Sequence, residues 1–205
     1  MYPAELQSLH DRVLHGLATK SLKYSKQGFT LRSGKTSHVL IDASRTIKSG
    51  EHFEDIGYLC ERFLHSLTDH WPVAVGGPAT GCDPLCAALL ATTSVRLDWF
   101  SVRKEPKNRG LDYGCLSGAY PTSGESVVLF EDVLTTGGSL LHAIEQCRPK
   151  MDILGVFVLV DREEGGREAI QAALPDALFH AEFTLDEIEA YKRAQAGGRM
   201  PWDDE

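Results

Sequence analysis

The stretch that most constrains the fold spans residues 127–144 and reads VVLFEDVLTTGGSLLHAI. Its first part is a run of Val, Leu and Phe, which is typical of a strand buried on both faces of a parallel sheet. Its last part has apolar residues at helical spacing, and a Thr/Gly/Ser turn joins the two parts. The stretch therefore predicts a strand, a turn and a helix amino terminus in direct succession, which is a unit of α/β folds.

The turn in this stretch has the chemistry of a phosphate site. Its glycines allow close approach of a ligand to the backbone, and its hydroxyls lie beside the unpaired amides of the following helix. These donors come from Thr135, Thr136, Gly137, Gly138 and Ser139. The alternative is an ordinary strand-to-helix connection with a helix cap.

Two carboxylates, Glu131 and Asp132, precede the turn and argue against that alternative. They would repel a phosphate, so we expect them to accept hydrogen bonds from neutral hydroxyls, such as those of a ribose, or to help place a cation. The turn matches neither a Walker loop nor a dinucleotide fingerprint. A sugar phosphate satisfies both halves of the stretch.

Strand and helix patterns alternate along the rest of the chain. Apolar spacing predicts helices at residues 5–17, 51–67, 85–90, 167–173 and 185–196. Short β-prone runs predict a hairpin of strands 28–33 and 36–41, and further strands at 72–76, 96–102, 153–160 and 177–183. We expect an α/β fold with a central parallel sheet flanked by helices.

The length of 205 residues predicts a single domain. Within it we expect a small hood formed by residues 1–45 and the carboxyl-terminal segment, a core at about 46–183, and a frayed tail at 197–205. Residues 76–83, 103–114, 131–139 and 161–166 all follow predicted strands. Because open α/β sheets bind ligands at strand carboxyl ends, these four segments predict one shared site.

A basic segment, RKEPKNRG, follows the strand predicted at 96–102. Its Pro, Asn and Gly residues disfavour continuation of that strand, so we expect a mobile loop. Such a loop could close over a pyrophosphate and neutralise charge on a leaving group. The alternative is a solvated surface loop, which the negative charge of the whole chain and the neighbouring phosphate turns disfavour. Its cations are Arg103, Lys104, Lys107 and Arg109.

Bulk properties exclude several classes of protein. The net charge of −8 disfavours a nucleic-acid or anionic-membrane partner. The absence of a long apolar run or a signal-peptide pattern predicts a soluble, cytoplasmic protein without a membrane partner. The five cysteines are odd in number and scattered, which predicts reduced thiols.

Five motifs together resemble the orotate phosphoribosyltransferase family, within the type I phosphoribosyltransferases, over nearly the whole chain. In chain order they are FTLRSGKTS, GGPATGCDPL, VRKEPKNRG, FEDVLTTGGS and LVDREEGG. The resemblance implies transfer of a 5-phosphoribosyl group from phosphoribosyl pyrophosphate (PRPP) to orotate in pyrimidine biosynthesis, without covalent catalysis. It also implies Mg²⁺ as cofactor, carried mainly by PRPP with a water-mediated contact to Asp132 rather than direct protein ligands.

The resemblance assigns roles to particular residues. It implies that PRPP is bound by Arg103, Lys104, Lys107, Arg109, Glu131, Asp132 and residues 135–139. It implies that orotate is bound by Arg32, Leu40, Ile41, Thr135 and Arg162. Arg103, Lys107 and Asp132 are the catalytic residues that it predicts, and a homodimer would share the loop at 103–114 between subunits.

The chain departs from the family pattern at three places. Gly81 stands where many members have lysine, Arg109 replaces a histidine, and residues 39–41 replace an aromatic cluster. Two alternatives therefore stay open beside the orotate enzyme. One is a phosphoribosyltransferase for another base, which would give Arg162 no substrate carboxylate, and the other is a non-catalytic relative that regulates nucleic acid.

Overall fold

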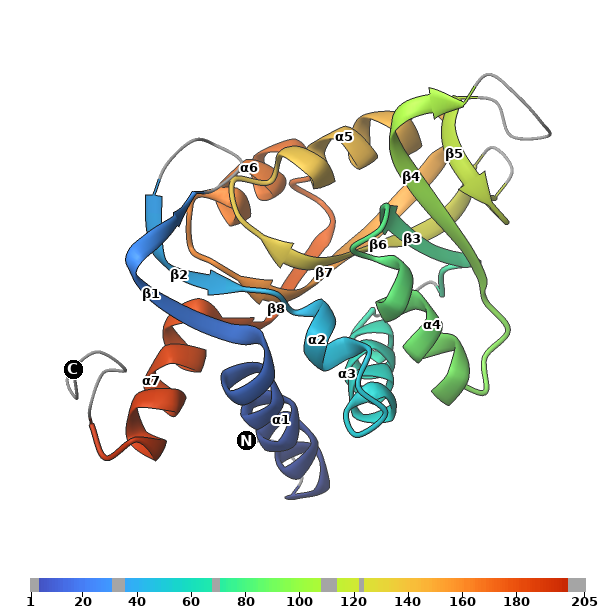
Figure 1. Ribbon diagram of the computed structural model, residues 1–205. Coiled ribbons are helices and arrows are strands. Elements are labelled where there is room, and N and C mark those ends of the chain that lie inside the picture. Colours follow the sequence, from blue (N-terminus) through green and yellow to red (C-terminus); the bar gives the residue numbers. More distant parts are fainter. Residues whose placement is uncertain (1–3, 31–35, 68–70, 108–113, 122–123, 199–205) are drawn as a thin grey trace.

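The computed structural model describes residues 4–30, 36–67, 71–107, 114–121 and 124–198, and side chains from residue 8 onward (Figure 1). The helices are α1 (Ala4–Gly16), a π-helical turn η1 (Leu17–Ser21), α2 (Ser44–Ile47), α3 (Phe53–His65), α4 (Asp83–Thr92), α5 (Gly138–Cys147), α6 (Gly166–Ala173) and α7 (Leu185–Gln195). The strands are β1 (Leu22–Thr30), β2 (Thr36–Ile41), β3 (Ala74–Pro78), β4 (Asp98–Lys107), β5 (Gly114–Gly118), β6 (Glu125–Leu134), β7 (Met151–Asp161) and β8 (Leu178–Thr184). Among the described residues, no helix has the length and apolar character needed to cross a membrane.

Six strands form the central sheet, in the order β5-β4-β3-β6-β7-β8. The pairs from β4 to β8 are parallel, and β5 alone runs antiparallel, against β4. β6 lies between β3 and β7, so the strand of the FEDV motif is central. The predicted parallel sheet is confirmed, with one antiparallel edge strand added.

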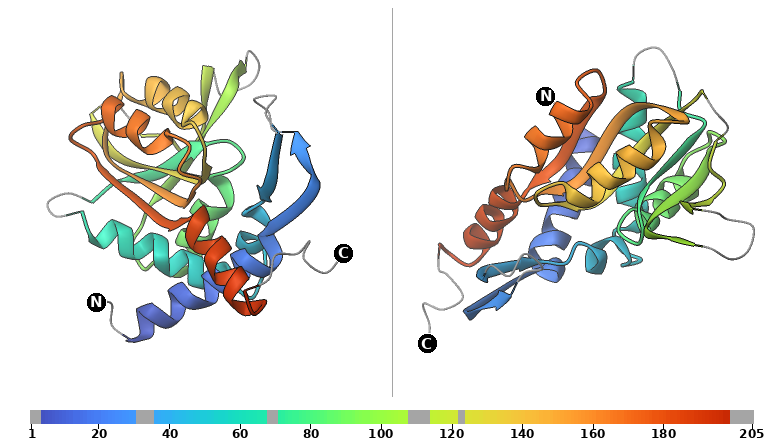
Figure 2. Two further views of the ribbon diagram at one scale, coloured as in Figure 1. Left: turned by 90° about the vertical axis from the view of Figure 1, so that its left-hand side faces the viewer. Right: turned by 90° about the horizontal axis from the view of Figure 1, so that it is seen from above.

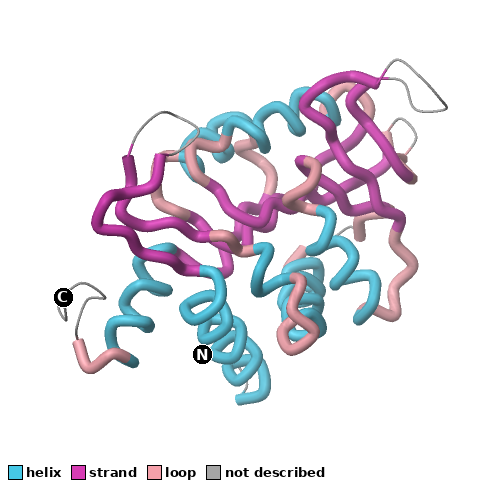
Figure 3. The backbone as a smooth tube through the Cα atoms, in the orientation of Figure 1, coloured by secondary structure: helices cyan, strands magenta, loops and turns pink. Residues whose placement is uncertain are grey.

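Helices cover both faces of the sheet (Figure 3). Side chains along the strands alternate between two apolar clusters, one on each face. On β6, Val128 and Phe130 belong to the cluster formed with α1, α3, α4 and α7. Val127 and Leu129 point the other way, into the cluster formed with α5 and α6. A strand that is apolar on both faces can therefore sit only inside the sheet.

The hood is an antiparallel pair, β1 and β2, that stands to one side of the sheet, with α1 and α7 at its base (Figure 2). Leu22 pairs with Ile41, and both side chains are buried in the core. Lys192 of α7 closes this base because its ammonium group donates hydrogen bonds to the carbonyls of Ala18 (2.8 Å) and Leu22 (3.1 Å).

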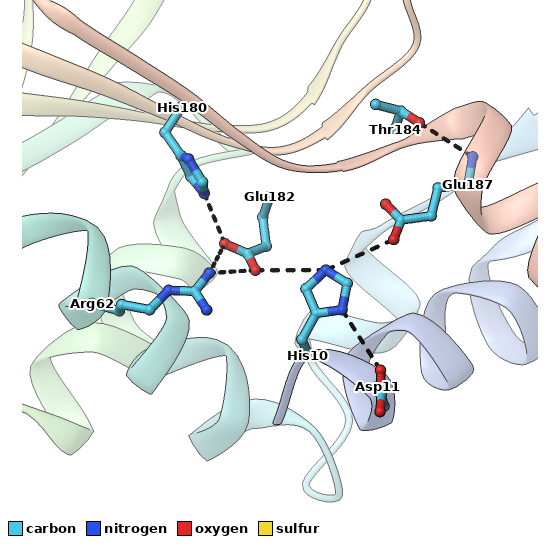
Figure 4. A network of polar contacts seen from close by, with 7 residues as sticks. All are labelled: His10, Asp11, Arg62, His180, Glu182, Thr184 and Glu187. Carbon is cyan, nitrogen blue, oxygen red and sulfur yellow. Dashed lines mark hydrogen bonds and ion pairs between the residues drawn. The ribbon is translucent and has the colours of Figure 1, made fainter. Parts of the chain in front are cut away.

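A buried ion network joins the helices α1, α3 and α7 to β8 of the sheet (Figure 4). Glu182 of β8, whose side chain is 1% exposed, accepts hydrogen bonds from Arg62 of α3 and from His180, the latter at 2.9 Å. Burial alone would raise the pKa of Glu182, but these two bonds outweigh it and lower the pKa. The ring of His10 on α1 lies 3.9 Å from carboxylate oxygens of both Glu182 and Glu187.

The strand boundaries correct one expectation. Pro106 was expected to end the strand near residue 102, but β4 continues to Lys107. The strand continues because β5 pairs with it again at Lys107 and Gly114, after an irregularity in register beyond Val102. Since β3 ends opposite Val102, no ladder on that side requires the N–H that Pro106 lacks. Arg103, Lys104 and Lys107 thus lie on a strand rather than on a loop.

Candidate active site

The acidic pair lies at the centre of the sheet, near the carboxyl end of β6. Glu131 is 7% exposed, and the side chain of Asp132 accepts a hydrogen bond from the backbone N–H of Val133 at 2.8 Å. Burial, together with the neighbouring Asp132, raises the pKa of Glu131 well above its ordinary value, and Lys104 opposes this rise. Burial also raises the pKa of Asp132. Two adjacent carboxylates held in this way favour hydrogen-bond donors or a cation as neighbours.

The turn after the acidic pair opens toward solvent. Gly137 has a φ of 83°, a conformation that glycine adopts without strain, and α5 begins at the next residue. Thr136, Gly138 and Ser139 are exposed. A Cβ atom added to Gly138 would meet no described atom within 4 Å. The first amides of α5 are therefore accessible to an anion, as the sequence predicts.

The end of β3 and the turn between β3 and α4 are packed closely against β6. A Cβ atom at Gly77 would lie 2.2 Å from the carbonyl oxygen of Phe130. One at Gly81 would lie 2.5 Å from Oδ1 of Asp132 and 3.0 Å from Oε1 of Glu131. Gly81, which departs from the family pattern, thus faces the acidic pair so closely that a side chain there would displace the Asp132 carboxylate.

The turn between β7 and α6 adjoins the phosphate-type turn. The N–H of Arg162 donates to the carbonyl of Leu134 at 2.9 Å. A Cβ atom on Gly166 would come within 2.4 Å of the carbonyl oxygen of Thr135. The side chain of Arg162 is 6% exposed and forms an ion pair with Glu164 at 2.9 Å. Arg162 and Thr135, both predicted for orotate, are therefore on neighbouring turns.

The basic residues approach the acidic pair from β4. Lys104 interacts electrostatically with Glu131, and the carbonyl of Arg103 lies 3.1 Å from Nε2 of His142 on α5. Lys107 is exposed at the end of β4. Arg109, the fourth predicted cation, lies outside the described residues. Parts of four predicted segments therefore meet at one edge of the sheet, as expected.

The hood supplies the remaining predicted residues. The side chain of Ile41 is buried in the core, whereas Leu40 is partly exposed. Arg32 lies outside the described residues. Asp42 lies directly after β2. Burial is the main cause of the raised pKa of Asp132, and the negative charge of Asp42 adds to it. The end of β2 is therefore within electrostatic reach of the acidic pair.

The described residues contain no cluster of three or more His, Cys, Asp or Glu side chains that could hold a metal ion. The acidic pair nevertheless fits a Mg²⁺ ion that arrives with a phosphate substrate. Mg²⁺ is commonly held by one or two carboxylates together with substrate phosphates and water. A cation beside Glu131 and Asp132 would also relieve the cost of burying two like charges.

Comparison with known proteins decides the family. The chain is 38% identical over 159 residues to orotate phosphoribosyltransferase of Aquifex aeolicus, covering 74% of this chain and 83% of that protein. It is 35% identical over 144 residues to orotate phosphoribosyltransferase of Pyrococcus horikoshii, covering 70% and 75% respectively. The chain belongs to the orotate phosphoribosyltransferase family. No family model matches the sequence.

Solved structures agree with this family assignment. Orotate phosphoribosyltransferase of Mycobacterium tuberculosis, in complex with Fe(III) dicitrate, superposes with a TM-score of 0.75 at 26% identity, covering 88% of this chain and 98% of that one. Adenine phosphoribosyltransferase of Leishmania donovani superposes with a TM-score of 0.64 at 14% identity, covering 93% and 84%. The second likeness concerns the fold alone.

The sequence did not indicate three residues that the structure places near the predicted site of this orotate phosphoribosyltransferase family member. Asp42 acts on Asp132, Glu164 pairs with Arg162, and Glu189 of α7 interacts electrostatically with Arg162. Only the position of Glu164, two residues after Arg162 in a glycine-containing turn, offered a signal. The other two contacts depend on how the hood packs.

Proposed function

We propose that this protein transfers the 5-phosphoribosyl group of PRPP to orotate, forming orotidine 5′-phosphate and pyrophosphate in pyrimidine biosynthesis. One observation carries the proposal: the turn that follows the acidic pair is packed directly against the turn that holds the buried Arg162. The site thus combines groups for a sugar phosphate with a cation for a substrate carboxylate.

The PRPP half of the site is built on β6. We propose that Glu131 and Asp132 accept hydrogen bonds from the two ribose hydroxyls, which supply the donors that a buried acidic pair needs. The amides and hydroxyls from Thr135 to Ser139, of which Thr136, Gly138 and Ser139 are exposed, would hold the 5-phosphate at the amino terminus of α5. The ribose would then be fixed from both ends.

The orotate half is built around Arg162. A guanidinium group can bind a carboxylate through two parallel N–H···O bonds, which orients a planar substrate as well as attracting it. We propose that Arg162 binds the orotate carboxylate, while Thr135, Arg32 and the backbone of Leu40 and Ile41 border the ring. A purine base has no carboxylate to pair with this arginine.

The reaction joins N1 of orotate to C1 of the ribose and expels pyrophosphate. The chain contributes positioning of the two reactants and stabilisation of developing charge. Arg103, Lys104, Lys107 and Arg109 would bind the pyrophosphate and strengthen their contacts as its negative charge grows. Mg²⁺, bound with PRPP and touched through water by Asp132, would supply further charge neutralisation.

We further propose a cytoplasmic homodimer in which residues 103–114 of one subunit cover the site of the other. Lys107 is exposed at the tip of an edge-strand pair, which suits a contact beyond its own subunit. All five cysteines are free thiols, which fits a reducing compartment.

An assay of pyrophosphate release with PRPP and Mg²⁺ tests the function. Orotate should support turnover, and uracil, hypoxanthine and adenine should support little or none. Preference for an uncharged base would favour the phosphoribosyltransferase for another base. Absence of turnover with all four bases would favour the non-catalytic relative.

Mixing two inactive variants tests the shared site. Lys107→Ala and Asp132→Asn should each lose most activity while keeping the fold. If the loop acts across the dimer, mixed dimers contain one intact site, and activity should return after the two variants are allowed to exchange subunits. No recovery, with subunit exchange demonstrated by a tagged subunit, would contradict the sharing of residues 103–114.

A further inference from the structure

The guanidinium group of Arg162 is already engaged by a carboxylate of its own turn. Its Nη2 atom lies 2.9 Å from Oε1 of Glu164, while the Arg162 side chain is 6% exposed and that of Glu164 is 37% exposed. The Nε atom of Arg162 is buried and has no hydrogen-bond partner among the described residues. The cation is therefore fixed in place, but only part of its donor set is used.

The backbone of this turn is held without help from the side chain of Glu164. The carboxylate of Asp161, which is 1% exposed, accepts a hydrogen bond from the N–H of Glu163 at 2.8 Å and one from Nε of Arg167 at 3.1 Å. The N–H of Arg162 bonds to β6. Glu164 could therefore leave Arg162 by rotating its side chain into solvent, without any change in the turn.

A second carboxylate acts electrostatically on the same arginine. Glu189 of α7 interacts electrostatically with Arg162 and shares a hydrogen bond with Tyr24 of β1. This residue is held by the hood, whereas Glu164 is held by Arg162 alone among the ion pairs and hydrogen bonds of the described residues. Of the two carboxylates, Glu164 is the one that an incoming anion can displace.

We propose that Glu164 occupies the place of the orotate carboxylate on Arg162 in the free protein and sets the affinity for orotate by competing with it. This inference rests on the proposed function. The pair keeps a buried cation neutralised until the substrate arrives, at the expense of some orotate affinity. When orotate binds, its carboxylate replaces that of Glu164, which moves out to solvent.

The test is Glu164→Gln, which removes the competing charge and keeps the shape of the side chain. Because the Glu164 side chain is 37% exposed, solvent screens its attraction to Arg162, and the KM for orotate should fall by only roughly two- to fivefold. The kcat value should stay within about twofold of the wild type, because Glu164 has already left Arg162 in the complex saturated with orotate. The KM for PRPP should also stay within about twofold, because the proposal gives Glu164 no contact with PRPP. An orotate dissociation constant measured by calorimetry should fall with the KM.

Glu163→Gln is the matched control, because it removes the same charge from an exposed neighbour in the same turn. It should leave the KM for orotate unchanged. An unchanged or raised KM in Glu164→Gln would overturn the proposal, a rise meaning that Glu164 positions Arg162. An equal fall of the orotate KM in both variants would also overturn the proposal, because it would show that the change in net charge alone lowers the KM. Wild-type protein inactive on orotate would instead refute the proposed function.

Discussion

Two glycine-containing turns follow neighbouring strands of this sheet, and they use glycine for opposite reasons. At the end of β3 and in the turn after it, Gly77 and Gly81 let the backbone approach other protein atoms, and a Cβ atom at either position would collide with β6. In the turn after β6, Gly137 provides a left-handed conformation and Gly138 has open space around it. The first turn supports the acidic pair, and the second is left open for a ligand.

This difference teaches that glycine in a phosphate-type motif does not by itself identify ligand contact. The space that glycine leaves free is filled by the protein in one turn and is open in the other. Substitution by alanine should therefore separate the two uses: it should disturb packing within the protein at Gly77 and Gly81, and substrate binding alone at Gly138.

Gly77→Ala should have the largest effect. Its Cβ atom would lie 2.2 Å from a backbone oxygen of the central strand, which cannot move without disturbing the sheet. We expect a loss of about 3 kcal/mol in the free energy of unfolding, which corresponds to a fall in Tm of roughly 6–12 °C for a domain of this size. Thermal unfolding measures this fall in Tm, and a Tm equal to that of the wild type would disprove the close packing of Gly77 against β6.

Gly81→Ala should affect the site more than the fold. Its Cβ atom meets the end of the Asp132 side chain, which can move aside at small cost but then leaves its position for the ribose. We expect kcat/KM for PRPP to fall by about ten- to a hundredfold, with a loss of stability of about 1 kcal/mol. Steady-state kinetics measure the first effect and thermal unfolding the second. A kcat/KM for PRPP equal to that of the wild type would contradict the prediction.

Gly138→Ala should leave the fold intact, because no described atom lies near the added methyl group. The free energy of unfolding should change by less than about 1 kcal/mol. The methyl group would partly cover the first amides of α5, so the KM for PRPP should rise by roughly three- to tenfold. An unchanged KM would show that the phosphate does not rest on this turn.

Glu131→Gln should produce the smallest effect, on the pH dependence of stability. Because the pKa of Glu131 is raised in the folded protein, the contribution of Glu131 to stability is most favourable below the ordinary carboxyl pKa, near 4, and is lost as the pH rises toward the raised value. The variant should therefore lose less stability between pH 5 and pH 8. The measurement is the change in Tm between pH 5 and pH 8 for the wild type and for Glu131→Gln, with Glu163→Gln as control. An equal change in Tm in the wild type and in Glu131→Gln would contradict the raised pKa.

The sequence predicted those parts of the fold that local pattern determines. The apolar run, acidic pair and turn of β6 and α5 appear as expected, because burial on both faces and glycine at the turn leave few alternatives. β5 was not predicted: its five residues carry no alternating pattern, and its pairing with β4 decides its conformation. The extension of β4 past Pro106 has the same cause.

The same division, between features set by local sequence pattern and features set by packing of distant segments, applies to the site. The motifs indicated Arg162 and the acidic pair, and the structure brings their turns together. The partners of these residues were missed because they depend on packing between distant segments. Glu189 reaches Arg162 from α7, and Asp42 reaches Asp132 from the end of β2. No periodicity or spacing within either segment signals such a contact.

The ion network around Glu182 has a consequence for the order in which the chain can fold during synthesis. α1 is made first, yet His10 lies against Glu182 and Glu187, and Lys192 bonds to the carbonyls of Ala18 and Leu22. These partners are separated by about 170 positions. The helix α1 can therefore pack early against α3, where Arg12 pairs with Asp55, but it gains its contacts with β8 and α7 only after the last helix has left the ribosome. The hood, and with it the orotate side of the site, is completed only when translation ends.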